Sequence, residues 1–148
     1  MPKKLNNNHG FTLPELLVCL AVIGVLAGVS LPIYRTVIKK NDLNIVVSSV
    51  VFSLRRAQLL SQAVDGDTAW GVKIQEGSIT IFKGVSYATR DTDFDEISDV
   101  STTISVGGTT EAVFAKFTGF PQTTGTINLS TQGDVRSVSF NEKGTIAF

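Results

Sequence analysis

The side chain best placed to do chemistry is the carboxylate of Glu15, which stands at the start of a long uncharged run. The run, residues 16–33, reads LLVCLAVIGVLAGVSLPI and contains no charged side chain. Its length is at the lower limit of about 18 residues for a helix that crosses a membrane. An ionised carboxylate costs about 2.5–3.5 kcal/mol at the membrane centre, so an acid in this place predicts a function.

A second group of acids lies far along the chain, in the segment DTDFDEISD. Its carboxylates are those of Asp91, Asp93, Asp95, Glu96 and Asp99. Alternating oxygen ligands can wrap Ca²⁺, although this spacing is not that of an EF-hand, because Glu96 stands where that loop has glycine. We interpret the segment as a solvated acidic loop in the first place, and Ca²⁺ is the one cofactor for which it is a candidate.

The remaining residues argue against catalysis. The chain has one histidine, His9, and one cysteine, Cys19, too few for a zinc cluster or an intramolecular disulfide. His9 lies in a polar N-terminal segment, so no Ser-His-Asp or Cys-His arrangement is indicated. We therefore expect a protein that is not an enzyme.

Charge is segregated along the chain although the formal net charge is zero. Residues 1–56 hold seven basic and two acidic side chains, whereas residues 57–148 hold six basic and eleven acidic ones. Nucleic-acid binders usually carry a basic excess. The acidic C-terminal part would repel phosphate, so we do not expect nucleic acid as a partner.

Three interpretations of the apolar run compete: a cleaved secretory signal, a plain membrane anchor, and an anchor that is also an assembly surface. A secretory signal is disfavoured by Glu15 and by the lack of an A-x-A site after the run. A plain anchor leaves Gly10 and Glu15 without a role.

The motif Gly10-Phe11-Thr12-Leu13-Pro14-Glu15-Leu16-Leu17, after a short basic leader, resembles the class III signal of type IV pilins and type II secretion pseudopilins. The resemblance implies that a prepilin peptidase cuts between Gly10 and Phe11 and methylates the new N-terminal Phe11. It also implies that Glu15 is the intramembrane carboxylate of the family. A free Phe11 amine in low dielectric needs a counter-ion, and Glu15 of the same or a neighbouring subunit could supply it.

The same resemblance implies a single-pass protein of the bacterial inner membrane, with an extracytoplasmic head, that later joins a filament. Its partners would be other pilins or pseudopilins through the N-terminal helix, the prepilin peptidase and the inner-membrane assembly platform. The segment marked by Gly24, Gly28 and Pro32 resembles the part of the pilin helix that can unwind. Ordinary packing through small residues predicts the same sequence, so both interpretations stay open.

Hydrophobic periodicity predicts an α+β fold in which a long N-terminal helix, hydrophobic and then amphipathic, packs on a mostly antiparallel β-sheet head. We expect a cleaved leader at 1–10, a transmembrane and assembly helix at 11–34, an amphipathic continuation at 35–64 and a β-rich head at 65–148. The apolar stripe of the amphipathic part is Leu43, Val47, Val50, Leu54 and Ala57.

From residue 69 the hydrophobic period changes to two, which predicts short strands. A hairpin around Gly77 joins the first two, at 70–74 and 79–82. Further strands are expected at 113–117, 127–129, 135–140 and 146–148, all in one antiparallel sheet.

The head is similar to the GspH/FimT group of minor pseudopilins and minor pilins. The similarity lies in Arg55-Arg56-Ala57 on the helix, followed by Trp70-Gly71-Val72, Phe117-x-x-x-Pro121 and Val138-x-Phe140-x-x-x-Gly144. It implies a minor structural subunit at the tip of a type II secretion pseudopilus or a type IV pilus. The alternatives are a major type IV pilin and a surface DNA-binding minor pilin. The second is disfavoured because no arginine follows Gly144.

Overall fold

The computed structural model describes residues 10–148, except for the side chains of residues 29–40. Residues 1–9, with His9, lie outside the described part. The chain divides into two compact units, residues 1–37 and 38–148. Helix α1, Leu13–Gln62, supplies the whole described secondary structure of the first unit and the first element of the second.

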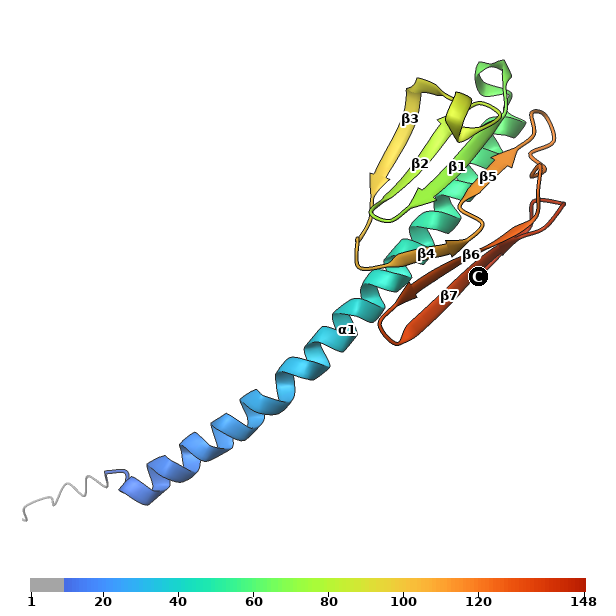
Figure 1. Ribbon diagram of the computed structural model, residues 1–148. Helices are drawn as coiled ribbons and strands as arrows, with labels where there is room; N and C mark the ends of the chain where they lie inside the picture. The colour runs from blue at the N-terminus through green and yellow to red at the C-terminus, as the bar shows by residue number, and fades with distance from the viewer. Residues whose placement is uncertain (1–9) are drawn as a thin grey trace, which may run out of the picture. The chain divides into compact units, whose positions relative to one another are not determined.

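The second unit is the head, in which eight strands follow α1 over the described residues. They are β1 (Trp70–Gln75), β2 (Ser78–Lys83), β3 (Asp91–Asp99), β4 (Ser105–Gly108), β5 (Glu111–Phe114), β6 (Gly125–Thr131), β7 (Asp134–Phe140) and β8 (Ile146–Ala147). Short 3₁₀ turns, Asp65–Asp67 and Tyr87–Thr89, precede β1 and β3. The order β3-β2-β1-β5 forms a first sheet and the order β4-β6-β7-β8 a second. Figure 1 labels the strands of both sheets except β8. Neighbouring strands are antiparallel in both sheets.

The predicted α+β class is confirmed, and the head differs from the expectation in having two sheets instead of one. Strand β4 was not expected. It lies between β3 and β5 in the sequence but pairs with β6, so the chain leaves the first sheet and then returns to it. Such a crossover has no signature in a hydrophobic period of two, which identifies strands and not their neighbours.

The acidic segment 91–99 is strand β3, so its interpretation as a loop is wrong. Thr, Phe and Ile alternate with the acids and favour an extended chain, and pairing with β2 outweighs the low strand preference of aspartate. The strand lies at a sheet edge with nearly all of its residues exposed, where charged side chains cost little.

Another expected strand ends early. Strand β5 stops at Phe114, and the chain then turns, with Phe117 in the left-handed region at φ 70°. The Phe117 N–H donates to the carbonyl oxygen of Ser61 at 3.0 Å, a bond to the helix that replaces continued strand pairing.

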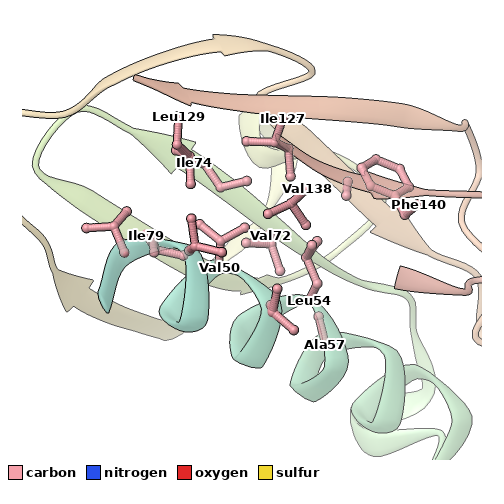
Figure 2. Packing of buried hydrophobic residues seen from close by; sticks show 14 of the residues in the cluster. Val50, Leu54, Ala57, Val72, Ile74, Ile79, Ile127, Leu129, Val138 and Phe140 are labelled. Carbon is pink, nitrogen blue, oxygen red and sulfur yellow. The ribbon is translucent and has the colours of Figure 1, made fainter. Parts of the chain in front are cut away.

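The core of the head lies between α1 and the inward faces of both sheets. The predicted stripe of α1 is buried along its whole length, from Leu43 to Ala57. Figure 2 shows Val50 and Leu54 of this stripe facing Val72 of the first sheet and Val138 of the second. Each fully buried large aliphatic side chain contributes about 1.5–3 kcal/mol to the free energy of folding. Because both sheets pack on this one stripe, its burial stabilises both of them.

Two polar side chains connect the last turns of α1 to the rest of the head, Ser61 to strands and Gln58 to loops. The Ser61 hydroxyl is fully buried; it donates to the carbonyl oxygen of Phe114 and accepts the Trp70 N–H, both at 3.0 Å. The Gln58 amide donates to the carbonyl oxygens of Gly119 and Gly144, at 3.1 and 3.2 Å. Both glycines have positive φ, and a Cβ on Gly144 would collide with the Gln58 amide. These positions therefore require glycine.

An ion pair connects α1 to the edge strand β3. The Arg56 guanidinium donates to both carboxylate oxygens of Glu96, each at 2.6 Å. The hydrogen bond from Arg56 holds the pKa of Glu96 below its ordinary value, and the same bond raises the pKa of Arg56. The ionised carboxylate is therefore the form that this contact stabilises in the folded head.

The buried hydroxyl gives a first prediction. Ser61→Ala should lower the free energy of unfolding by about 2–3 kcal/mol, because it leaves the Trp70 N–H and the Phe114 carbonyl without their buried partner. Ser48→Ala is the matched control, since that exposed hydroxyl donates only to the Asn44 carbonyl one turn away. Urea unfolding of the detergent-solubilised chain measures both changes, and equal stabilities for the two variants would contradict this role of Ser61.

The ion pair gives a second prediction, on pH dependence. A depressed folded-state pKa stabilises the fold above the unfolded pKa, and this stabilisation is lost as pH falls through the folded value. Glu96→Gln should therefore cost about 1 kcal/mol or less at neutral pH, because both side chains are partly solvated. The difference from the unmodified chain should vanish well below pH 4.5.

Unfolding curves at a series of pH values test this, with Glu142→Gln as a control at an exposed acid in the turn after β7. A Glu96→Gln difference that persists unchanged into strong acid would show that the charge of Glu96 is not responsible.

Candidate functional site

The start of helix α1 is the candidate site, because it brings together Gly10, Phe11 and Glu15. Residues 10–12 are not helical, and α1 begins at Leu13. The first helical hydrogen bond runs from the Leu16 N–H to the Thr12 carbonyl at 3.1 Å. Pro14 is the second helical residue, where a missing N–H leaves no helical bond unmade.

Glu15 folds back on the residues before the helix. Its carboxylate accepts the backbone N–H of Thr12 at 3.4 Å. Thr12 is the N-cap and Glu15 the third helical residue, so this contact is one half of a capping box, and a negative charge suits the positive end of the helix. The spacing Thr12-x-x-Glu15 is the sequence signal of such a cap, and it can be recognised without the family resemblance.

The bond between Gly10 and Phe11 lies in the accessible, non-helical stretch before the cap. Gly10 is exposed, and a Cβ added to it would meet no atom within 4 Å. Phe11 is 81% exposed. An enzyme could therefore reach this bond without unwinding α1.

The segment Leu13–Gly28 of α1 presents apolar side chains on all sides. The large exposed ones at this end of the chain are Phe11, Leu13, Leu16, Leu17, Val18, Leu20, Val22, Ile23, Val25 and Leu26. Leaving water would stabilise each by about 1.5–3 kcal/mol, so the segment favours lipid or another apolar surface. Cys19 is exposed among them. The predicted run continues to residue 33, where the side chains lie outside the described residues.

The helix is unbroken through Gly24 and Gly28, and a Cβ at either position would meet no atom within 4 Å. Residues four apart lie on one side of a helix, so the two glycines form a shallow gap in the apolar surface. The third residue of this group, Pro32, lies where side chains are outside the described residues. Both unwinding and close packing remain predictions for this segment.

By length and composition, the stretch Asn41–Gln62 is the one helical stretch among the described residues that is long and apolar enough to cross a membrane, and the described part of the N-terminal segment, Leu13–Gly28, is a shorter apolar helix. This stretch supplies the buried stripe of the head, from Leu43 to Ala57, and carries Arg55 and Arg56. We therefore assign it to the core of the head, and Leu13–Gly28 to the exposed apolar helix.

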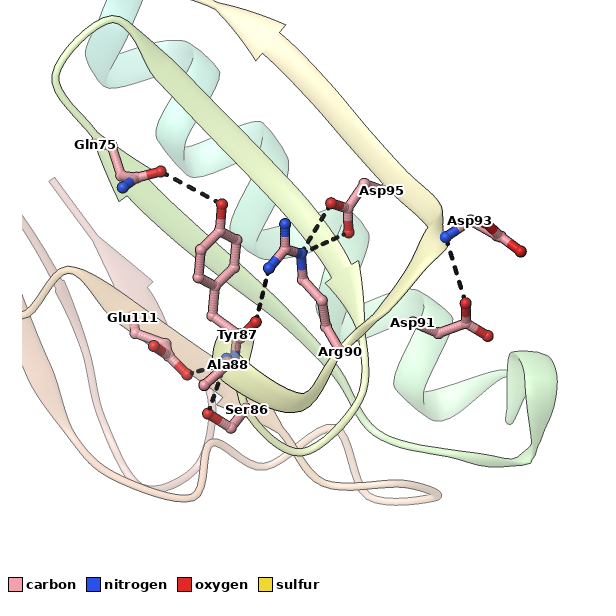
Figure 3. Close-up of polar contacts among 9 residues, drawn as sticks. All are labelled: Gln75, Ser86, Tyr87, Ala88, Arg90, Asp91, Asp93, Asp95 and Glu111. Carbon is pink, nitrogen blue, oxygen red and sulfur yellow. Dashed lines mark hydrogen bonds and ion pairs between the residues drawn. The ribbon is translucent and has the colours of Figure 1, made fainter.

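The acids proposed for Ca²⁺ are drawn to different partners. The Asp95 carboxylate forms an ion pair with the Arg90 guanidinium at 2.8 Å, and the Glu96 carboxylate forms one with Arg56. The Asp91 carboxylate accepts the backbone N–H of Asp93 at 3.3 Å. Figure 3 shows Asp95 directed at Arg90, and Asp91 and Asp93 directed away from it. Within residues described by the structure, no three His, Cys, Asp or Glu side chains are grouped so as to hold a metal ion.

Arg90 was not singled out from the sequence, yet it organises this part of the head. Its guanidinium also donates to the Tyr87 carbonyl at 2.8 Å and lies over the Tyr87 ring at 3.8 Å. The hydrogen bond with Asp95 raises the pKa of Arg90. These contacts fix the connection between β2 and β3 and have no reactive group among them.

Comparison with known proteins identifies the N-terminal segment. Residues 5–31 match the model of the prokaryotic N-terminal methylation motif. No curated protein and no solved structure matches the chain significantly. The matched residues include the capped helix start and the whole exposed apolar segment Leu13–Gly28, and together these features indicate a type IV pilin-like prepilin.

Proposed function

We propose that the chain is a minor pilin or minor pseudopilin of the GspH/FimT group, built into the tip of a type IV pilus or a type II secretion pseudopilus. The observation that carries the proposal is the methylation motif at residues 5–31, which contains the exposed apolar helix segment Leu13–Gly28. A protein of this kind acts by assembly and not by catalysis.

Processing is the first step of the proposed function. Prepilin peptidase cuts between Gly10 and Phe11 and methylates the Phe11 amine on the cytoplasmic side of the inner membrane. The exposed, non-helical backbone before α1 supports this step, because the bond between Gly10 and Phe11 can be reached without unwinding the helix.

Assembly is the second step, and Glu15 sets its register. Cleavage creates an ammonium group on Phe11, which needs a counter-ion once it leaves water. Glu15 is already turned toward the residue next to Phe11, where it accepts the Thr12 N–H. In the filament its carboxylate neutralises the Phe11 amine of a neighbouring subunit, and this pairing fixes how far one helix slides along the next.

The driving force for assembly is the lateral burial of the apolar helix against like helices, together with the charge pairing of Glu15 and Phe11. The first ten residues carry two lysines and no acid. Cleavage after Gly10 therefore reduces the basic residues from thirteen to eleven and leaves all thirteen acidic residues in place. The mature subunit has an acidic head outside the membrane, which favours protein partners over nucleic acid.

The processing step gives a third prediction. Gly10→Val should block cleavage, because a branched side chain adds bulk beside the bond that is cut, at the position where the motif has glycine. Mass spectrometry of the membrane-bound chain should then find residues 1–10 retained, whereas the unmodified chain should begin with N-methylated Phe11. Asn8→Val is the control within the leader and should be processed, while normal processing of Gly10→Val would refute the assigned cleavage site.

The register mechanism gives a fourth prediction. Glu15→Ala and Glu15→Gln should both insert into the membrane normally and both enter filaments at least about tenfold less, because an unpaired charge is costly in low dielectric. Glu15→Gln keeps an oxygen that can accept the Thr12 N–H, so it separates charge from capping. Quantitative immunoblots of sheared filaments and of membranes measure both steps. Normal incorporation of Glu15→Gln would show that the cap matters and that charge pairing does not.

A further inference from the structure

Strand β3 forms an edge of the first sheet, and its outer side has no neighbouring strand among the described residues. It pairs regularly with β2 over Glu96–Asp99, and the register then shifts before Asp91 pairs with Lys83. The regular part therefore presents an extended row of backbone N–H and C=O groups along a free edge. Such an edge is a template for another strand.

A groove lies beside this edge, between β3 and helix α1. Ser98 of β3 lines it together with Asn44, Ile45, Ser48, Ser49, Phe52 and Ser53 of the helix, and its volume is about 450 Å³. Ile45 and Phe52 are 54% and 66% exposed, although they lie on the helix that forms the core. The first sheet ends at β3 and leaves both side chains uncovered.

The charge of the edge selects what can cover it. Asp91, Asp93 and Asp99 are exposed and, within the described chain, take part in no ion pair. Glu96 points toward α1, where Arg56 neutralises it. Pairing between the β3 edges of two copies would bring these carboxylates together, which is unfavourable, whereas a strand with lysine or arginine would be attracted.

We propose that β3 is a docking edge for a short extended segment of a partner protein in which basic and apolar side chains alternate. The segment adds a fifth strand to the first sheet and pairs its backbone with Glu96–Asp99. Its apolar side chains, on the face shared with Ser98, cover Ile45 and Phe52. Its basic side chains, on the opposite face, lie near Asp99. This mode is strand addition, in which backbone bonds give affinity and alternate side chains give specificity.

A synthetic peptide tests the proposal on the full chain in detergent micelles, and the test does not depend on processing or on filament assembly. The probe is a seven-residue peptide of alternating lysine and valine with blocked ends. A second peptide of the same sequence is N-methylated at alternate residues, so it keeps its charge but cannot pair as a strand. We expect saturable binding of the first and binding at least about tenfold weaker of the second, the effect of losing two or three backbone hydrogen bonds.

Two exposed positions on α1 supply matched variants. Phe52→Lys places a charge in the groove and should weaken binding of the unmethylated peptide about tenfold, while Leu59→Lys, at a residue of similar exposure two turns further on, should leave it unchanged. Hydrogen exchange should slow at the amides of Glu96–Asp99 when the peptide is bound.

Equal binding of the two peptides would show attraction by charge alone and overturn the proposal. No binding at low salt would overturn it too and would leave the acids of β3 as groups that keep the edge unpaired.

Discussion

Burial of one stripe of helix α1 is the interaction on which the head depends. Both sheets place their inward faces on residues 43–57, and the same cluster includes side chains from the first sheet and from the second. Each four-stranded sheet removes its apolar face from water by packing into this cluster, to which the helix contributes its stripe. The first sheet leaves one flank of the helix uncovered, at Ile45 and Phe52, because it ends at β3.

The N-terminal part of the same helix has the opposite character. Between Leu13 and Gly28 its apolar side chains are exposed on all sides, so one continuous element serves as a core on one stretch and as a surface on the other. The two uses differ in pattern: an amphipathic stripe needs a sheet, whereas an all-round apolar helix needs lipid or other helices. Glu15 interrupts the apolar stretch at its beginning, where the helix dipole and the Thr12 N–H already stabilise a negative charge.

Much of this could be predicted from residue patterns alone. The helix, the buried stripe and the hairpin of β1 and β2 follow from periodicity and from turn residues such as Gly77, which act locally. The second sheet, strand β4 and the true state of residues 91–99 could not be predicted, because they depend on which strands become neighbours. The contacts of Ser61, Gln58 and Arg90 were hidden for the same reason, since their partners are polar backbone atoms or acids brought close only by the fold.

The bonds of Gln58 have a consequence for the order of folding. This side chain donates to the carbonyl of Gly144, 86 positions later, and Ser61 donates to Phe114, 53 positions later. Contacts between residues so far apart in the sequence form slowly, and the ribosome must release the chain beyond Gly144 before the last of them can form. During synthesis the helix therefore emerges first, with its stripe bare. A newly made chain therefore leaves that stripe exposed to water until the last strands of the head have formed.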